Sequence, residues 1–321
     1  MSSKSIDPSL SKSETTLGNT LNLDTHTYTA SLDQLDCLIV SGKDARSFLQ
    51  GQVTCDMNAV SQHHSLPGAH CTNKGRVVFS FRAIELPPKE THEKSNEEKI
   101  ALIIPTELLD IAHKALSKFI VFSKASLHIS QDYKILGLFG KDASTIVNDI
   151  KDSPEISNAL SIITILPNQM ICLVDKNYLE KLSPFIANAV ETSFSSWQLC
   201  NIRGGIADIY AGASELFLPQ MLNFDENEGI NYKKGCYIGQ ENTARIKLKN
   251  KLSKRLLAIQ LISGKLTEGA SIYANDIEIG KVLINDEYPF ALIKYLDENF
   301  KKDSELKSEN AVLRIKIPNW I

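Results

Sequence analysis

One cysteine in this chain has neighbours that suit thiol chemistry. Cys236 lies between Gly235 and Gly239 in the run Tyr232-Lys-Lys-Gly-Cys-Tyr-Ile-Gly-Gln-Glu-Asn-Thr-Ala-Arg245. Glycine permits positive φ and close approach to the backbone, and nearby cations lower a thiol's pKa and raise its thiolate fraction. The run therefore predicts a reactive or ligating thiol on a tight turn. The alternative is that Cys236 is a small buried hydrophobic residue in an ordinary turn.

Other residues offer weaker chemistry. Thiol and imidazole groups that could hold a metal fall within seventeen residues, at Cys55, His63, His64, His70 and Cys71. Their spacing matches no standard metal site, so structural roles are the alternative and no metal is predicted. The chain also lacks Walker A, G-x-G-x-x-G, G-x-S-x-G and H-E-x-x-H sequences, which excludes the usual nucleotide, hydrolase and metalloprotease signatures.

Two further features could contact a ligand. The basic turn Asn73-Lys-Gly-Arg76 precedes a strand-like run from Val77, and it is either an anion contact or a plain hairpin tip. Trp197 could stack on a flat heteroaromatic ligand, although a single tryptophan is often a core or interface residue.

The composition is that of a soluble multidomain protein. A chain of 321 residues is long enough for two or three domains. The net charge of -3 gives no overall attraction to nucleic acid or anionic lipid. Residues 1–29 are polar, lack the apolar stretch of a signal peptide and are expected to be a disordered tail. Scattered cysteines and the absence of a long apolar run favour a cytoplasmic protein without a membrane partner.

An internal repeat indicates how the candidate residues are positioned. Gly42-Lys-Asp-Ala45 recurs as Gly140-Lys-Asp-Ala143, each after an apolar strand-like run and before a helix-like segment. Farther along, each copy has a second apolar run, at 100–104 and at 170–174, followed by apolar residues at helical spacing. The repeat predicts two α+β units of ferredoxin-like character. From Lys251, short strand-like runs and the turn Ala274-Asn-Asp276 predict a small antiparallel barrel or sandwich.

The motif around the cysteine resembles that of a known family. All eight positions of Lys234-Gly-Cys-Tyr-Ile-Gly-Gln-Glu241 fit the K-G-C-[FY]-x-G-Q-E signature of the YgfZ family. The resemblance extends over most of the chain from about residue 32 to 255. It includes Phe48-Leu-Gln-Gly-Gln-Val-Thr54 with Asp56, Ala69-His-Cys71 with Lys74-Gly75, Val121-Phe-Ser-Lys124, and Leu218-Pro-Gln220 with Asn223.

The resemblance implies a fold like that of the glycine cleavage T-protein, an aminomethyltransferase that uses tetrahydrofolate. Such a fold has two α+β domains and a C-terminal β-domain around a central folate pocket. The expected divisions are a tail at 1–29, a first, folate-binding domain at 30–130, a second domain with the motif at 131–250, and a barrel domain at 251–321.

The resemblance also assigns candidate site residues. Cys236 is the key thiol, with Lys234, Gln240 and Glu241 in its frame. Trp197 matches a tryptophan at the family's folate pocket, and Leu35 occupies the position of a second one. The remaining expected folate contacts are Lys74, Arg76, Gln220 and Asn223.

Three functions follow from these features. The first is an auxiliary factor, without classical turnover, that uses a reduced folate and Cys236 to support tRNA modification and iron–sulfur clients such as the tRNA methylthiotransferase. The second is an aminomethyltransferase or related one-carbon transfer enzyme. The third is direct tRNA binding by a basic run, expected on a strand, at Arg245, Lys247, Lys249, Lys251, Lys254 and Arg255. The alternative for this run is a solvated basic strand and turn.

Overall fold

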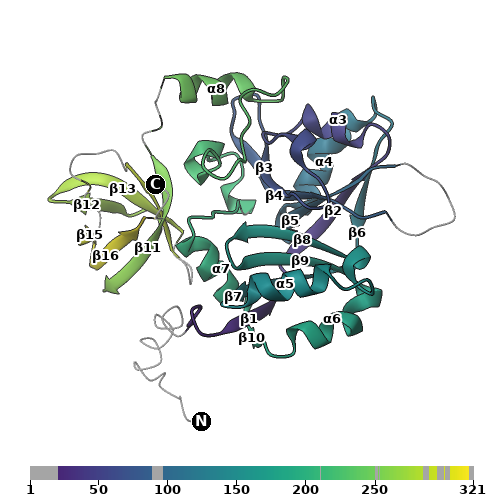
Figure 1. The fold of residues 1–321 in the computed structure, drawn as a ribbon. Helices are drawn as coiled ribbons and strands as arrows, with labels where there is room; N and C mark the ends of the chain where they lie inside the picture. Colours follow the sequence, from purple (N-terminus) through teal and green to yellow (C-terminus); the bar gives the residue numbers. More distant parts are fainter. Residues whose placement is uncertain are drawn as a thin grey trace, which may run out of the picture.

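Strands dominate the architecture, in two open sheets and one closed barrel. The computed structural model describes residues 21–88, 97–209, 211–249, 252, 254–284, 289–294, 300 and 304–317. The barrel lies to one side, the two sheets lie to the other, and irregular segments and α8 lie between and above them (Figure 1).

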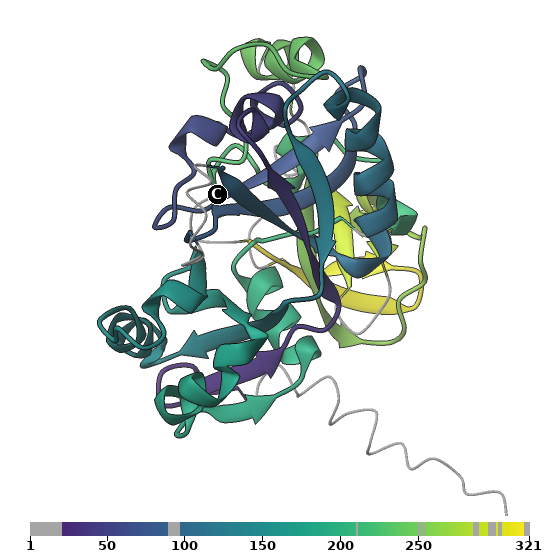
Figure 2. The ribbon, with the colours of Figure 1, turned by 90° about the vertical axis from the view of Figure 1, so that its right-hand side faces the viewer.

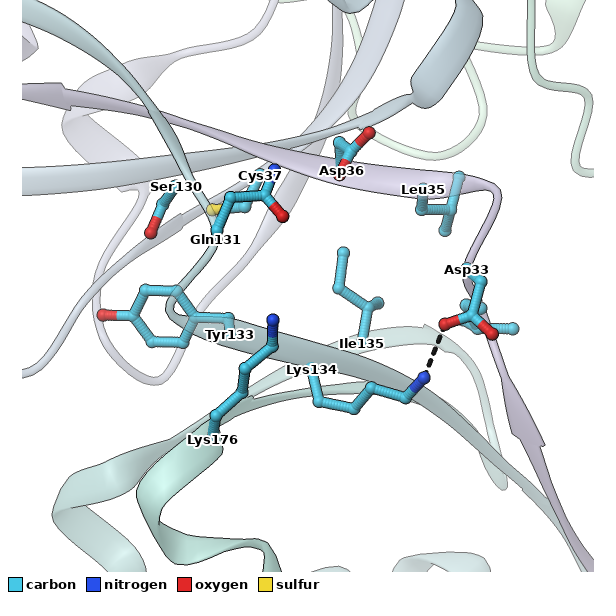
Figure 3. Close-up of a pocket in the computed structure, with 11 residues that line it drawn as sticks. Asp33, Leu35, Asp36, Cys37, Ser130, Gln131, Tyr133, Lys134, Ile135 and Lys176 are labelled. Atoms are coloured by element: carbon cyan, nitrogen blue, oxygen red, sulfur yellow. Dashed lines mark hydrogen bonds and ion pairs between the residues drawn. The ribbon is translucent and has the colours of Figure 1, made fainter.

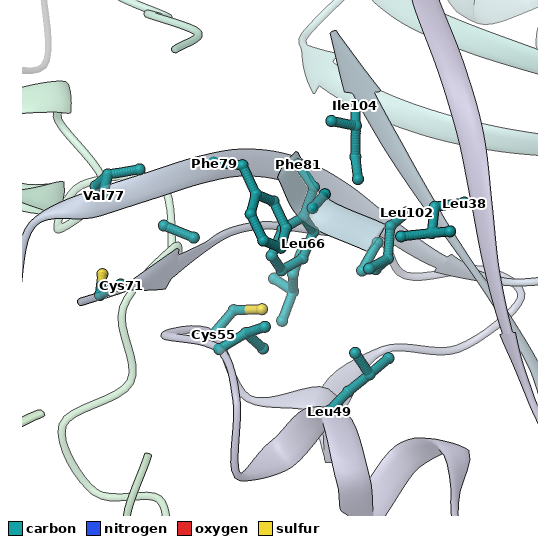
Figure 4. Packing of buried hydrophobic residues seen from close by; sticks show 14 of the residues in the cluster. Leu38, Leu49, Cys55, Leu66, Cys71, Val77, Phe79, Phe81, Leu102 and Ile104 are labelled. Atoms are coloured by element: carbon teal, nitrogen blue, oxygen red, sulfur yellow. The ribbon is translucent and has the colours of Figure 1, made fainter. Parts of the chain in front are cut away.

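The first sheet has five strands in the order β3-β4-β5-β2-β6. Its strands are β2 (Leu35–Ser41), β3 (Leu66–Cys71), β4 (Val77–Glu85), β5 (Lys99–Pro105) and β6 (Ser126–Ser130). Helices α3 (Ala45–Gln50) and α4 (Leu109–Ile120) cover one face, together with the short turns η1 (Met57–Ala59) and η2 (Thr106–Leu108). Because the buried residues of α4 recur at helical spacing, one stripe of this helix closes a core that includes Phe79 and Phe81 (Figure 4).

The second sheet also has five strands, in the order β10-β1-β7-β9-β8. Its strands are β1 (Thr27–Ser31), β7 (Tyr133–Gly140), β8 (Leu160–Leu166), β9 (Gln169–Asp175) and β10 (Val190–Thr192). Helices α5 (Ala143–Lys151) and α6 (Leu179–Ile186) cover its outer face, with the turns η3 (Ser157–Ala159) and η4 (Lys176–Tyr178).

The predicted duplication is confirmed. Gly42 follows β2 before α3, and Gly140 is the last residue of β7 before α5, with φ of 122° and 107°. A Cβ at Gly42 would lie 2.4 Å from the Lys124 carbonyl oxygen, and one at Gly140 would lie 2.2 Å from the His26 carbonyl oxygen. Both copies therefore begin with the same turn, which only glycine makes without strain.

The two sheets face each other and bury a shared core (Figure 2). The first sheet contributes side chains such as Cys37 and Ile39, and the second contributes Ile171 and Leu173. Helix α7 (Phe194–Arg203) adds Trp197 to this core. The two units are thus stacked in the order helices, sheet, sheet, helices.

Two segments lie elsewhere than the expected domain divisions place them. Thr27–Ser31, expected to lie partly in the tail and partly in the first domain, form β1 of the second sheet, beside β7 and β10. The tail expected at 1–29 otherwise falls mainly on residues 1–20, which lie outside the described residues. Beyond α7, Phe217, Leu222 and Ile230 pack into the core of the first unit, so the segment before the motif packs on the first unit.

The C-terminal barrel confirms the other main prediction. Its strands close in the order β11-β14-β13-β12-β15-β16. They are β11 (Arg255–Ser263), β12 (Ser271–Ala274), β13 (Ile277–Ile284), β14 (Phe290–Ile293), β15 (Leu306–Ser308) and β16 (Ala311–Lys316). Asn275 and Asp276 both have positive φ between β12 and β13, as a two-residue hairpin turn requires.

The remaining helical elements connect the second unit to the barrel. They are the turns η5 (Ala211–Ala213) and η6 (Pro219–Leu222), followed by helix α8 (Gln240–Leu248). In the described part of the chain, no helix is long and apolar enough to cross a membrane.

Candidate functional site

The cysteine motif forms a loop that leads into α8. Gly239 is the N-cap of this helix, with φ of 85°. A Cβ there would lie 2.6 Å from the Thr72 carbonyl oxygen and 3.0 Å from Cys71 Cβ. The end of the motif therefore lies against the β3–β4 turn so closely that only glycine fits.

The β3–β4 turn is shaped to receive the motif. Gly75 has φ of 72°, and a Cβ there would lie 3.3 Å from the Gly239 carbonyl oxygen. Asn242, in the first turn of α8, donates through Nδ2 to the Asn73 carbonyl oxygen at 3.2 Å. The fold thus brings together two candidate segments that lie more than 150 residues apart in the sequence.

A second anchor holds the beginning of the motif. Asn231 donates its backbone N–H to the Thr54 carbonyl oxygen at 2.9 Å and its Nδ2 to Asp56 Oδ2 at 3.2 Å. Its Oδ1 accepts the backbone N–H groups of Lys233 and Lys234 at 2.8 and 3.0 Å. The loop that follows α3 therefore fixes the backbone just before the cysteine.

Lys234 reaches into the same loop. Its Nζ donates to the carbonyl oxygens of Val53 at 2.8 Å and Cys55 at 2.6 Å, and it lies 5.2 Å from the centre of the Tyr237 ring. Burial lowers the pKa of Lys234 to about 8, because the charged form loses water that these partners replace only in part.

Cys236 lies between these two anchors, and it is exposed, whereas the other five cysteines are buried. Burial raises the pKa of four of them to about 12, namely Cys37, Cys55, Cys71 and Cys172. A Cβ at the neighbouring Gly235 would meet nothing within 4 Å. Only Cys236 among the cysteines is thus available to a reagent or partner without opening the fold.

The other predicted frame residues lie at the start of α8. Glu241 is exposed and forms an ion pair with Arg245, four residues later, at 2.6 Å. Gln240 is half-buried in the first turn. A carboxylate at this end of a helix is favoured by the helix dipole. The roles of Gln240 and Glu241 toward the thiol stay predictions.

Trp197 and Leu35 both belong to the core between the sheets, but they differ in exposure. Trp197 is 1% exposed and packs edge-on against Phe139, with ring centres 5.5 Å apart. A Cβ at Gly137 would lie 2.5 Å from the Trp197 ring. In this conformation the tryptophan has no exposed face for stacking, and its ligand role stays a prediction.

Leu35 lines a pocket of about 250 Å³ where the chain crosses between the two sheets (Figure 3). Lys176 and Gln131 point into this pocket, and Lys134 pairs with Asp33 across its rim at 2.5 Å. None of the other predicted folate contacts lines it. The structure therefore does not bring Leu35 together with the motif.

The remaining predicted ligand contacts lie on either side of the motif loop. Lys74 and Arg76 are exposed on the β3–β4 turn, and Arg76 donates to the Leu216 carbonyl oxygen. Gln220 is 1% exposed and donates through Nε2 to the Thr243 carbonyl oxygen at 2.8 Å, while its Oε1 has no hydrogen-bond partner within the described residues. Asn223 is fully buried between Gly205 and Arg255, bonded to each at 3.0 Å.

The basic run is arranged differently from the expectation. Arg245 and Lys247 lie on helix α8 and not on a strand. Arg255 begins β11 but is 7% exposed, bonded to Asn223 and Glu226. Lys251 lies outside the described residues. Because Arg245 and Lys247 are helical and Arg255 is buried, the predicted single basic face on a strand is wrong.

The candidate metal ligands do not form one site, and several of them have structural contacts instead. Cys55 and Cys71 belong to the first core (Figure 4). His70 stacks on Phe79, and burial lowers its pKa. In the portion of the chain that the structure describes, no three His, Cys, Asp or Glu side chains are grouped to hold a metal ion.

The predictions from the sequence did not mark two opposite charges that lie near each other in the first unit, Arg82 and half-buried Asp208. Arg82, on β4, is 8% exposed. Burial lowers the pKa of Arg82 and raises that of Asp208, and the opposite charges partly offset both shifts. The segment with Asp208 runs beside β4, where the Ile209 N–H bonds Ser80 Oγ at 3.1 Å. The signal was present in the sequence, because Ser80 and Arg82 alternate with apolar residues in an otherwise buried strand.

The protein thus has two stacked α+β units, a closed barrel and an exposed thiol on an anchored loop. Its fold is that of the glycine cleavage system aminomethyltransferase T from Bartonella henselae, with a TM-score of 0.65 over 96% of this chain and 89% of that one. The sequence identity is 11%, so this likeness shows the fold alone.

The sequence relatives are more specific. No protein-family model matches the chain. The tRNA-modifying protein YgfZ of Colwellia psychrerythraea (strain 34H) is 31% identical over 242 residues, which cover 73% of this chain and 71% of that one. The protein of the same name from Vibrio vulnificus (strain YJ016) is 29% identical over 243 residues, covering 74% and 71%. The chain belongs to the YgfZ family.

Proposed function

We propose that this protein is an auxiliary factor in tRNA modification and that Cys236 is its working residue. The observation that carries the proposal is the exposed thiol on a loop held at both ends by the first unit. The relatives are named tRNA-modifying proteins, and the motif that distinguishes the family contains this thiol.

An exposed cysteine of this kind supports three reactions. It can exchange with a disulfide on a partner, bind a partner's iron transiently, or attack an electrophilic one-carbon adduct. Each requires a thiolate that a partner can reach. A single thiol does not hold a cluster alone, so iron–sulfur clients such as the tRNA methylthiotransferase would supply the other ligands.

The proposed ligand is a reduced folate such as tetrahydrofolate, which would supply a one-carbon carrier. Support for it comes from the fold shared with aminomethyltransferase T and from family membership. The predicted contacts do not converge on one pocket in this conformation, because Trp197 is 1% exposed and Leu35 lines a separate pocket. Binding at Trp197 therefore requires the core between the sheets to open.

Calorimetric titration with tetrahydrofolate tests the ligand. We expect binding to the wild type and weaker binding to Trp197→Phe, which keeps a core aromatic but changes the stacking surface. Equal binding by the two proteins would exclude Trp197 as a contact. Absence of binding to the wild type would refute the proposal of a folate ligand, but it would not affect the proposal for Cys236.

The shared fold also supports a second candidate, a one-carbon transfer enzyme. Transfer of the methylene carbon of an aminomethyl-lipoyl carrier to tetrahydrofolate, with release of ammonia and the reduced lipoyl dithiol, measures that activity directly. We expect none above background, because the motif belongs to the YgfZ family. Multiple turnovers by the purified protein would favour the enzyme.

Mass spectrometry of tRNA nucleosides tests the main proposal. Cells that lack the gene should contain little methylthiolated adenosine. We expect wild type and Cys172→Ala, which loses a buried thiol, to restore it and Cys236→Ala to fail. Full restoration by Cys236→Ala would refute the role of the thiol, and unchanged nucleosides in the deletion strain would favour the folate enzyme.

A further inference from the structure

The motif lysine has contacts that differ from those its charge suggests. A lysine two residues before a cysteine is expected to stabilise the thiolate. Here Lys234 Nζ donates hydrogen bonds to two main-chain carbonyl oxygens of the first unit, those of Val53 and Cys55. We infer that Lys234 is a positioning residue, which holds the Cys236 loop on the first unit and does not act on the thiol through its charge.

The surroundings of the ammonium group favour positioning. Two converging carbonyl oxygens at 2.8 and 2.6 Å use two of its three N–H donors. The Tyr237 ring lies on another side, 5.2 Å away. Asp56 is near enough to influence Lys234, but its carboxylate accepts hydrogen bonds from Gln50 and Asn231. The ammonium is thus enclosed by groups of the first unit and the Tyr237 ring.

The same anchor extends through the main chain. Asn231 joins Thr54 and Asp56 to the backbone N–H groups of Lys233 and Lys234. The side chain of Lys234 then returns to the carbonyls on either side of Thr54. Removing it leaves two carbonyl oxygens without this donor, which costs free energy wherever water cannot replace the bond.

Lys233 provides a matched control. It carries the same charge one residue earlier, its backbone N–H binds the same Asn231 oxygen, and its side chain is exposed. Lys233→Met therefore removes one positive charge near Cys236 without removing the two carbonyl contacts. Lys234→Met removes the charge and the contacts but keeps an aliphatic chain beside Tyr237.

Two measurements separate positioning from a charge effect. Hydrogen exchange at the amides of residues 233 and 234 should quicken about tenfold in Lys234→Met and stay unchanged in Lys233→Met. The pH profile of alkylation by iodoacetamide reports Cys236, since the other cysteines are buried. We expect the thiol pKa from this profile to agree between the two variants within ~0.3.

A clearly higher thiol pKa in Lys234→Met than in Lys233→Met, with unchanged hydrogen exchange, would overturn the inference. If Lys234→Met does not fold, Asn231→Ala breaks the same anchor without changing the charge and should quicken exchange at the same amides. Unchanged exchange in Asn231→Ala would likewise contradict the anchor.

The meaning of Lys234 for activity rests on the proposed function of Cys236. If that function holds, Lys234→Met should restore less methylthiolated adenosine than Lys233→Met in the deletion strain. Equal restoration would show that the position of the loop does not limit activity. Rescue by Cys236→Ala would end the functional proposal, whereas the exchange and alkylation results would still decide what Lys234 does.

Discussion

The two α+β units share the order strand, helix, hairpin, helix and strand, but the first also has β3, whose turn with β4 has no counterpart in the second. In the first, the β3–β4 turn receives the motif loop, where a Cβ at Gly239 would lie 2.6 Å from the Thr72 carbonyl oxygen. In the second, the β8–β9 turn receives the end of α7, where Gln169 Nε2 bonds Asn201 Oδ1 at 2.6 Å. One turn supports an exposed thiol, and the other supports a buried helix.

This difference between the two units shows which contacts are common to both copies and which serve the Cys236 motif. Both units need the glycine turn before their first helix, at Gly42 and Gly140. Within the described residues, the two anchors of the motif lie in the first unit, largely in main-chain groups of residues 53–55 and 72–75. Both copies therefore have the same kind of fold, whereas the position of the Cys236 thiol depends on contacts that the first copy makes.

The largest expected effect comes from the second unit. Trp197→Ala empties a buried site in the core between the sheets and should lower the free energy of unfolding by about 3–5 kcal/mol. Because the anchors of the motif lie in the first unit, the alkylation rate of Cys236 should not change. Urea unfolding and alkylation by iodoacetamide below the unfolding transition measure the two quantities.

An altered alkylation rate in the folded variant would show that the state of the thiol depends on the second unit as well as on the first. A loss below about 1 kcal/mol would mean that Trp197 is not a core residue in solution. That outcome would agree with an open pocket at this tryptophan.

Patterns with local causes were predictable from the sequence. The repeated Gly-Lys-Asp-Ala run marked both units, because a positive φ before a helix requires glycine in each copy. Alternating apolar residues and the Asn275-Asp276 turn marked the barrel. The motif marked Cys236 as the distinctive thiol, and the structure adds that it is exposed.

Long-range partners were not predictable in the same way. Nothing local to β1 indicates that it joins the second sheet, since its partners β7 and β10 lie more than 100 residues away. Lys234 looked like a group that acts on the thiol, because spacing along the chain does not show the carbonyls of Val53 and Cys55. Arg255 looked like part of a basic surface until Asn223 and Glu226 were seen to bury it.

A smaller effect should separate the two glycines of the motif. Gly239→Ala places a Cβ against the Thr72 carbonyl oxygen at a φ of 85° and should cost about 2 kcal/mol. Gly235→Ala is the matched control, because a Cβ there meets nothing within 4 Å and should change stability by less than about 0.5 kcal/mol. Thermal or urea unfolding of both variants checks this.

Equal stability of the two variants would mean that the motif does not dock on the β3–β4 turn as described. If Gly235→Ala keeps its stability but fails to restore tRNA modification, the open space beside Cys236 serves a partner or ligand. Normal restoration would show that the partner approaches from elsewhere.

The smallest effect concerns one buried thiol from each unit. Burial raises the pKa of Cys71 and of Cys172 from 9.0 to about 12 in the folded protein. The stability from each neutral thiol is present below pH ~9 and is lost as the pH rises toward 12, because unfolding then releases a proton. Cys71→Ala and Cys172→Ala should each remove about 1 kcal/mol of the stability loss that the wild type shows between pH 8 and pH 10.

Cys71 makes this measurement a test of the motif itself. It is 1% exposed, and a Cβ at Gly239 would lie 3.0 Å from Cys71 Cβ, so the motif helps to cover it, whereas Cys172 lies within the second sheet. If only Cys172→Ala changes the pH dependence, the Cys71 thiol ionises nearly as easily in the folded protein as in the unfolded one. The motif loop would then leave the β3–β4 turn in the native state, and the thiol of Cys236 would move with it. If both variants change it equally, the loop stays closed over Cys71, and the fixed position of Cys236 is the state that a partner meets.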